Sequence, residues 1–227
     1  VMCCAIMQIV WVNVMQRLYF RSVIQSTHLR VFLERLARDL LPDHVHKACL
    51  RLQNTPYFSA DNLMCGHMFA DIVDWTDAVS HLASHQAFQL LCDIFRVFDS
   101  LCAANRIEKV ETTGDSYWCA VGIDTGQASQ SDMQRLIRFG LEMQRSLDPQ
   151  KIPSLNLLKE PLKLRVAIHY GTCMGCMVGS RAPRYHLFGP SIDIVKWLVS
   201  HGSGSGRGVL LTSAALRASV SCRSDVQ

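Results

Sequence analysis

Two aspartates stand where predicted strands end, and carboxylates at such positions could hold metal ions. Asp71 follows the apolar run Leu63–Ala70, and Asp115 lies in a Gly-Asp turn between two short segments that alternate like strands. If these strands are neighbours, both carboxylates project from one edge of a sheet. That arrangement suits two divalent cations about 4 Å apart, which can activate an oxygen nucleophile and stabilise a leaving pyrophosphate. Strand-end aspartates also occur as turn or cap residues, so the pair alone leaves both interpretations open.

The elements that must position these aspartates alternate between strands and helices along the chain. Helices are predicted at 85–105, around 133–143 and at 192–200, and strands at 63–70, 107–112, 117–121, 162–169, 172–178 and 209–212. A strand, a helix, a pair of strands, a second helix and a further strand follow the order of a split βαβ unit. The sequence therefore predicts an α/β (α+β) sandwich with a ferredoxin-like split βαβ core.

The N-terminal part of the chain has a different character. Residues 1–15 carry no charge, and five arginines follow between positions 17 and 38. This order is typical of the inner end of a transmembrane helix with a cytoplasmic flank, although a buried helix or an interfacial anchor would also fit so short a stretch. We expect 1–20 to end a transmembrane helix and 21–57 to be a helical linker. The net charge of +4 without a Lys/Arg run argues against a nucleic-acid partner.

Four segments resemble motifs of the class III adenylate and guanylate cyclases. They are Met68–Thr76, similar to F-A-D-I-x-G-F-T; Lys109–Tyr117, similar to K-V-E-T-I-G-D-A-Y; Leu164–Gly171, similar to R-x-G-I-H-x-G; and Gly179–Gly189, similar to G-S-R-M-P-R-Y-x-L-F-G. The segments occur in the order that the family has. On this resemblance, 58–227 is identified as a cyclase catalytic domain, with a truncated or divergent C-terminal end.

The resemblance implies a reaction and its metal ligands. Asp71 and Asp115 would bind two Mg²⁺ or Mn²⁺ ions, with the backbone carbonyl of Ile72 as a further ligand. The ribose 3′-oxygen of GTP or ATP would attack the α-phosphorus, giving a cyclic 3′,5′-nucleotide and pyrophosphate, the reaction of a phosphorus–oxygen lyase.

Further positions would bind the rest of the nucleotide if the resemblance holds. Backbone amides of Trp75 and Thr76, at the start of a helix, and the guanidinium of Arg165 would contact the phosphates. Glu111 matches a residue that accepts hydrogen bonds from guanine in guanylate cyclases, and His186 stands at the companion base-contact position. Glu111 favours GTP over ATP.

Three positions depart from the family pattern. The family has an Asn and an Arg where this chain has Asp193 and Trp197, and a Gly where it has Asp74. An ionised Asp accepts but does not donate hydrogen bonds, and Trp supplies no cation. We therefore expect a metal-bearing half that pairs, in a pseudo-symmetric dimer, with a complementary cyclase domain of the same or another chain that brings Asn and Arg. The alternative is an inactive, regulatory cyclase-like domain. Either would lie on the cytoplasmic side of a membrane.

Overall fold

The computed structural model describes residues 15, 19–32, 34, 45, 47, 59–179, 184–202 and 208–220. The chain forms two compact units, Val1–Gln53 and Asn54–Gln227. In the first unit, residues 19–32 are helical. None of the helices in the described ranges is long and apolar enough to cross a bilayer. Most of the segment expected to end a transmembrane helix, 1–20, lies outside the described residues.

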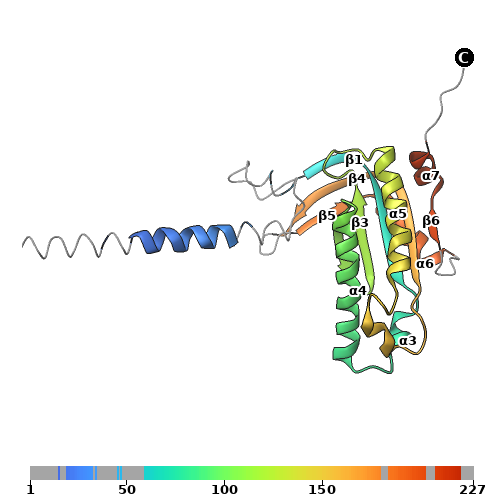
Figure 1. Ribbon diagram of the computed structural model, residues 1–227. Coiled ribbons are helices and arrows are strands. Elements are labelled where there is room, and N and C mark those ends of the chain that lie inside the picture. Colours follow the sequence, from blue (N-terminus) through green and yellow to red (C-terminus); the bar gives the residue numbers. More distant parts are fainter. Residues whose placement is uncertain are drawn as a thin grey trace, which may run out of the picture. The chain divides into compact units, whose positions relative to one another are not determined.

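A six-stranded sheet forms the centre of the second unit (Figure 1). The strand order is β2-β3-β1-β4-β5, every neighbouring pair on this path is antiparallel, and β6 pairs in parallel with β4. The strands are β1 (Ser59–Ile72), β2 (Glu108–Thr113), β3 (Ser116–Val121), β4 (Leu164–Val178), β5 (Arg184–Phe188) and β6 (Val209–Leu211).

Helices cover both faces of this sheet. The long helices α4 (Ser84–Ala104) and α5 (Gln130–Ser146) pack on one face, and α6 (Pro190–His201) contacts β1 and β4 from the other. The remaining helices are α3 (Trp75–Val79), the 3₁₀ turn η1 (Pro153–Leu157) and α7 (Ser213–Ser219). Helix α4 forms a buried stripe because apolar residues recur every four positions, at Leu90, Ile94, Phe98 and Cys102.

The alternation of β1 decides which face receives the site. Met68, Ala70 and Ile72 are buried in the core beneath α4 and α5. Successive side chains of a strand point to opposite faces, so Phe69 and Asp71 face the side of α6. The sequence thus builds an apolar core on one face and leaves the carboxylate at the end of the other.

The α/β sandwich expected from the sequence is confirmed, with one wrong strand assignment. The predicted strands 162–169 and 172–178 are one continuous strand, β4. Gly171 was interpreted as a turn residue, but it lies inside the strand, where a Cβ would collide with the Ser191 hydroxyl of α6 and lie 2.8 Å from His169 Nε2. The glycine therefore permits close approach of side chains rather than a reversal of the chain. Strand β5 and helices α3 and α7 were not predicted.

Candidate active site

Asp71 is held between two neighbouring strands. Its cross-strand neighbours are Ser116 on β3 and Arg165 on β4. Ser116 Oγ donates a hydrogen bond to Asp71 Oδ1 at 2.9 Å, and the Arg165 guanidinium donates one to Oδ2 at 2.7 Å. The side chains of Arg165 and Asp71 are only 27% and 20% exposed, so solvent screens this ion pair less than a surface pair. The carboxylate thus has a fixed orientation at the end of the sheet.

Asp115 approaches Asp71 from the β2–β3 turn. The turn reverses at Gly114, which has φ of +60°. Burial raises the pKa of the Asp115 carboxyl, and the negative charge of Asp71 raises this pKa further, while Arg165 opposes the increase. The mutual influence of the carboxyls shows that the structure brings the two aspartates to the same end of the sheet.

The donor set at this sheet end fits a hard divalent cation. In the described parts of the chain, no three His, Cys, Asp or Glu side chains are grouped to hold a metal ion by themselves. Mg²⁺ in phosphate-processing enzymes is commonly held by one or two carboxylates together with water and substrate phosphates. Asp71 and Asp115 offer such a pair of carboxylates, so the remaining ligands would come from backbone carbonyls, water and a nucleotide.

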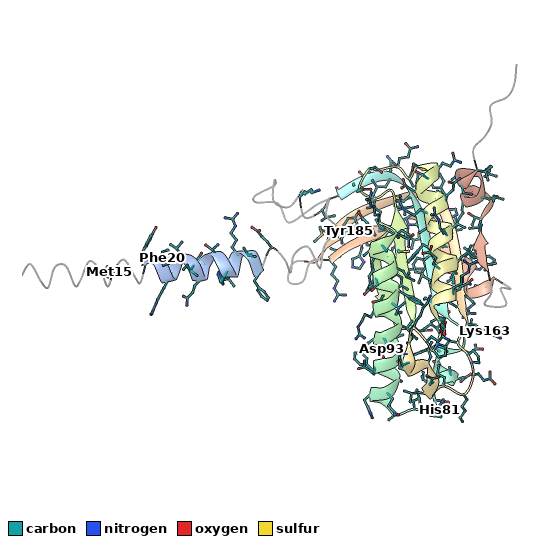
Figure 2. The ribbon with its side chains drawn as sticks, in the orientation of Figure 1. Met15, Phe20, His81, Asp93, Lys163 and Tyr185 are labelled. Carbon is teal, nitrogen blue, oxygen red and sulfur yellow. The ribbon has the colours of Figure 1, made fainter. Side chains whose placement is uncertain are left out.

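The segment after β1 turns sharply into α3. Asp74 adopts left-handed backbone angles, φ 51° and ψ 38°, where a glycine would be unstrained. Trp75 and Thr76 open α3 directly after it. A cavity of about 380 Å³ lies beside this turn, with His81 and Lys163 in its lining. Both residues lie at the end of the unit that is far from Tyr185 (Figure 2). Main-chain and cationic groups are therefore available near the end of β1.

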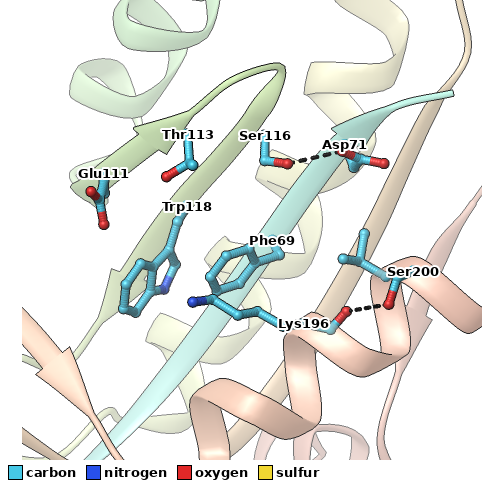
Figure 3. Close-up of a pocket in the computed structure, with 9 residues that line it drawn as sticks. Phe69, Asp71, Glu111, Thr113, Ser116, Trp118, Lys196 and Ser200 are labelled. Carbon is cyan, nitrogen blue, oxygen red and sulfur yellow. Dashed lines mark hydrogen bonds between the residues drawn. The ribbon is translucent and has the colours of Figure 1, made fainter. Parts of the chain in front are cut away.

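A second cavity, of about 360 Å³, lies between the sheet and α6 (Figure 3). Its lining residues come from four elements and are Phe69, Asp71, Glu111, Thr113, Ser116, Trp118, Lys196, Val199 and Ser200. Two of them form an apolar wall, because the rings of Phe69 and Trp118 stack with centroids 4.9 Å apart. Glu111 lies with its Oε2 atom 3.9 Å from His186 Nδ1, so the structure brings together the two expected base-contact positions.

Helix α6 presents three of its side chains in two directions. Asp193 is exposed, and Trp197 is 61% exposed with its ring stacked on His201 at 5.1 Å. Lys196 instead reaches over the sheet, with Nζ 5.4 Å from the Phe69 ring centroid and 5.5 Å from that of Trp118.

Lys196 and Trp118 were not singled out by the sequence. The one signal for Lys196 is that it is the only lysine or arginine of α6 and directly precedes the position where the family has Arg. Nothing in the local pattern of β3 marks Trp118, because its place in the cavity depends on the approach of α6.

Comparison with known proteins agrees with this fold and this placement of residues. The family model described as the adenylate and guanylate cyclase catalytic domain matches residues 60–222. The rat guanylate cyclase soluble subunit beta-2 is 30% identical over 180 residues, which are 78% of this chain and 25% of that protein. A receptor-type guanylate cyclase of Caenorhabditis elegans is 31% identical over 134 residues, 59% of this chain and 13% of that protein.

Solved cyclase structures share the fold at low sequence identity. The guanylyl cyclase Cya2 matches with a TM-score of 0.61 and 20% identity, over 73% of this chain and 80% of that one. The adenylyl cyclase CyaB from P. aeruginosa matches with a TM-score of 0.64 and 17% identity, over 70% and 81%.

The chain belongs to the adenylate and guanylate cyclase catalytic-domain family. It spans a quarter or less of the length of the two relatives described above.

Proposed function

We propose that this chain is the metal-bearing half of a nucleotide cyclase that converts GTP, in preference to ATP, into a cyclic 3′,5′-nucleotide and pyrophosphate. The observation that carries the proposal is the meeting of Asp71 and Asp115 at one sheet end, with Asp71 oriented by Ser116 and Arg165. Fixed carboxylates of this kind are suited to hold divalent cations against a triphosphate.

Each group of the site has a proposed task. Asp71, Asp115 and the carbonyl of Ile72 would hold two Mg²⁺ or Mn²⁺ ions, which supply Lewis-acid activation of the ribose 3′-hydroxyl and neutralise charge on the phosphates. Arg165, fixed by its pairing with Asp71, would add positive charge beside the phosphates. The 3′-oxygen forms a bond to the α-phosphorus, the bond to the bridging oxygen breaks, and pyrophosphate leaves with that electron pair.

The amides of Trp75 and Thr76 would hold the terminal phosphates, by the resemblance to the family motif. Asp74 before them places a negative charge next to that segment, and its side chain is exposed. We infer that this carboxylate points to solvent and weakens phosphate binding without preventing it.

A complementary half is required because α6 lacks the groups that stabilise the transition state in the family. Asp193 and Trp197 supply neither an amide donor nor a cation there. A pseudo-symmetric dimer with a domain that carries Asn and Arg would complete one site. Two copies of this chain alone would leave both sites incomplete.

The preference for GTP is supported by Glu111 and by the relatives. Glu111 offers a carboxylate to donors on a base edge, and His186 lies beside it. The relatives described above are named guanylate cyclases, whereas the structural neighbours include an adenylyl cyclase.

Attachment to a membrane through residues 1–20, with the catalytic unit on the cytoplasmic side, is part of the same proposal. It is supported by the uncharged start of the chain and the arginines that follow, and by the receptor-type name of one relative.

A second candidate function is a regulatory binding domain without turnover. The exposed Asp193 and Trp197 favour it, since both stand where the reaction needs other side chains.

Complementation separates the two functions. The chain, alone and mixed with a cyclase half that carries Asn and Arg but lacks its own metal carboxylates, is supplied with Mn²⁺ and GTP, and cyclic nucleotide is measured. Product from the mixture but from neither half alone supports the proposal. A stable heterodimer that yields no product would assign the chain to the regulatory class.

A further inference from the structure

We propose that Trp118 and Lys196, together with Glu111, form a recognition site for a purine ring that carries a carbonyl beside a ring N–H, as guanine does. The choice of a nucleotide base as the ligand rests on the proposed cyclase function. The recognition itself rests on the donors and acceptors in the cavity between the sheet and α6. Neither Trp118 nor Lys196 belongs to the residues that the family motifs mark for the base.

Trp118 is an unsatisfied donor in the wall of this cavity. The residue is only 5% exposed, and its indole Nε1 is buried with no hydrogen-bond partner. Indole nitrogen donates and cannot accept, so only an acceptor atom can satisfy it. A buried donor without a partner costs stability, which a ligand acceptor would restore.

Lys196 places a second donor, with a positive charge, on the same side of the cavity. Its amine and the indole nitrogen of Trp118 face the same space in Figure 3. No carboxylate among the described residues forms an ion pair with Lys196. Two neighbouring donors without an acceptor between them predict that the missing acceptor belongs to a ligand.

Glu111 supplies the opposite requirement from β2. Its carboxylate lines the same cavity, and in the described residues its ionic neighbour is His186 at 3.9 Å. An ionised carboxylate only accepts hydrogen bonds. A ligand that meets all three groups must carry acceptors toward Trp118 and Lys196 and donors toward Glu111.

A guanine ring satisfies this pattern and an adenine ring does not. Guanine carries the O6 and N7 acceptors next to its ring and amino N–H donors, whereas adenine presents an amino donor in place of O6. That amino group would face the Lys196 ammonium. The stacked rings of Phe69 and Trp118 offer a flat apolar wall, and aromatic stacking alone tolerates any base. The charged groups therefore set the selectivity.

A ring held here is bound rather than converted by this chain's own half. Asp193 and Trp197 of the same helix supply no amide donor and no cation for the reaction. The preference is therefore visible in binding, and it requires no metal ion and no partner.

The test is calorimetric titration of the full 227-residue chain with GMP and with AMP in EDTA. We expect GMP to bind about tenfold more tightly than AMP. Lys196→Met and Trp118→Phe should each weaken GMP binding by about five- to tenfold and change AMP binding little. Lys196→Arg keeps the charge and should retain most of the affinity. Lys151→Met, an exposed lysine outside the cavity, is the matched control.

Equal affinity for GMP and AMP, absence of GMP binding, or GMP binding that survives Lys196→Met would each overturn the inference. Thermal unfolding of every variant checks the fold, and Lys196→Met remains informative if Trp118→Phe is unstable, because Lys196 is exposed. Asp71→Ala should leave this metal-free binding intact. Failure of the cyclase assay with retained GMP selectivity would therefore refute the proposed function alone.

Discussion

The sheet end that carries Asp71 and the helix α6 that carries Trp197 show opposite relations to the family pattern. At the sheet end, the residues that match the motifs also contact one another, since Asp71 bonds to both Ser116 and Arg165. On α6, the two positions that matter for the reaction have changed type, and both side chains are exposed. One region has kept a built site and the other has not.

This difference indicates a division of labour rather than general loss of function. A decayed domain would be expected to lose the strained turns and buried polar contacts of its metal side as well, because these contribute only to the site. Here Asp74 still adopts a left-handed backbone and Asp71 still pairs across two strands. Lys196, on the altered helix, has meanwhile a defined place against Phe69 and Trp118.

The largest effect should come from the sheet end. Asp71→Ala or Asp115→Ala should lower cyclic-nucleotide formation with a complementary half by about a thousandfold or more, because the charge that holds the cations is lost. Initial rates with saturating Mn²⁺ and GTP measure the effect. A loss below tenfold in a folded variant would show that this end of the sheet is not the metal side.

A gain of function should come next, from α6. The double substitution Asp193→Asn and Trp197→Arg restores the family types, and should give this chain activity without a partner, about a hundredfold above the unaltered chain. The reason is that each copy would then carry both sets of groups. Assays of the purified chain over a concentration range measure it, with Trp197→Met as the control that removes the ring without adding a cation. No gain in a dimeric double variant would mean that α6 is not in reach of the reaction.

A smaller loss should follow from the contact that orients Asp71. Ser116→Ala removes the 2.9 Å hydrogen bond to Oδ1 and leaves the ion pair with Arg165 in place. One such hydrogen bond is worth about 1–1.5 kcal/mol, so the rate should fall roughly tenfold. Thr113→Ala, on the same cavity wall but not bonded to Asp71, is the comparison. Equal rates for the two variants would remove Ser116 from the argument.

The smallest effect on activity, none, is expected far from both regions. Helix α5 begins with a capping box in which Asp132 accepts hydrogen bonds from Ser129. Burial alone would raise the pKa of Asp132, but the Ser129 hydrogen bonds and the Arg135 charge outweigh it and lower the pKa. Asp132→Ala should therefore cost about 1 kcal/mol of unfolding free energy near neutral pH, without changing the cyclase rate.

The pH dependence of that cost has a definite sign. A lowered native pKa stabilises the fold above the unfolded value, about 3.9 for Asp, and the contribution disappears as pH falls through the native value. Urea unfolding at pH 7 and pH 3 compares the two proteins. A difference that grows on acidification would contradict the capping role.

The sequence was sufficient for the core elements and for the carboxylates, because both leave local patterns. Helix α4 follows from its four-residue spacing, and the hairpin that carries Asp115 follows from a Gly-Asp turn between alternating segments. The continuity of β4 was missed because Gly171 has the composition of a turn, whereas its actual role is to admit His169 and Ser191 side by side.

Contacts between distant segments could not be predicted in the same way. The pairing of Asp71 with Arg165 depends on strand register, since the two residues are 94 positions apart. Lys196 and Trp118 meet only because α6 packs over β1 and β3, and no pattern within either segment reports that approach.

The central claim is that this chain, and not its partner, supplies the metal-binding carboxylates. A crossed complementation assay tests it, with the aspartates removed first from this chain and then from a complementary half, and cyclic GMP measured in each mixture. The account predicts that Asp71→Ala with Asp115→Ala in this chain abolishes product, while removal of the partner's own metal carboxylates leaves the rate unchanged. Product that survives the first change and vanishes with the second would contradict it.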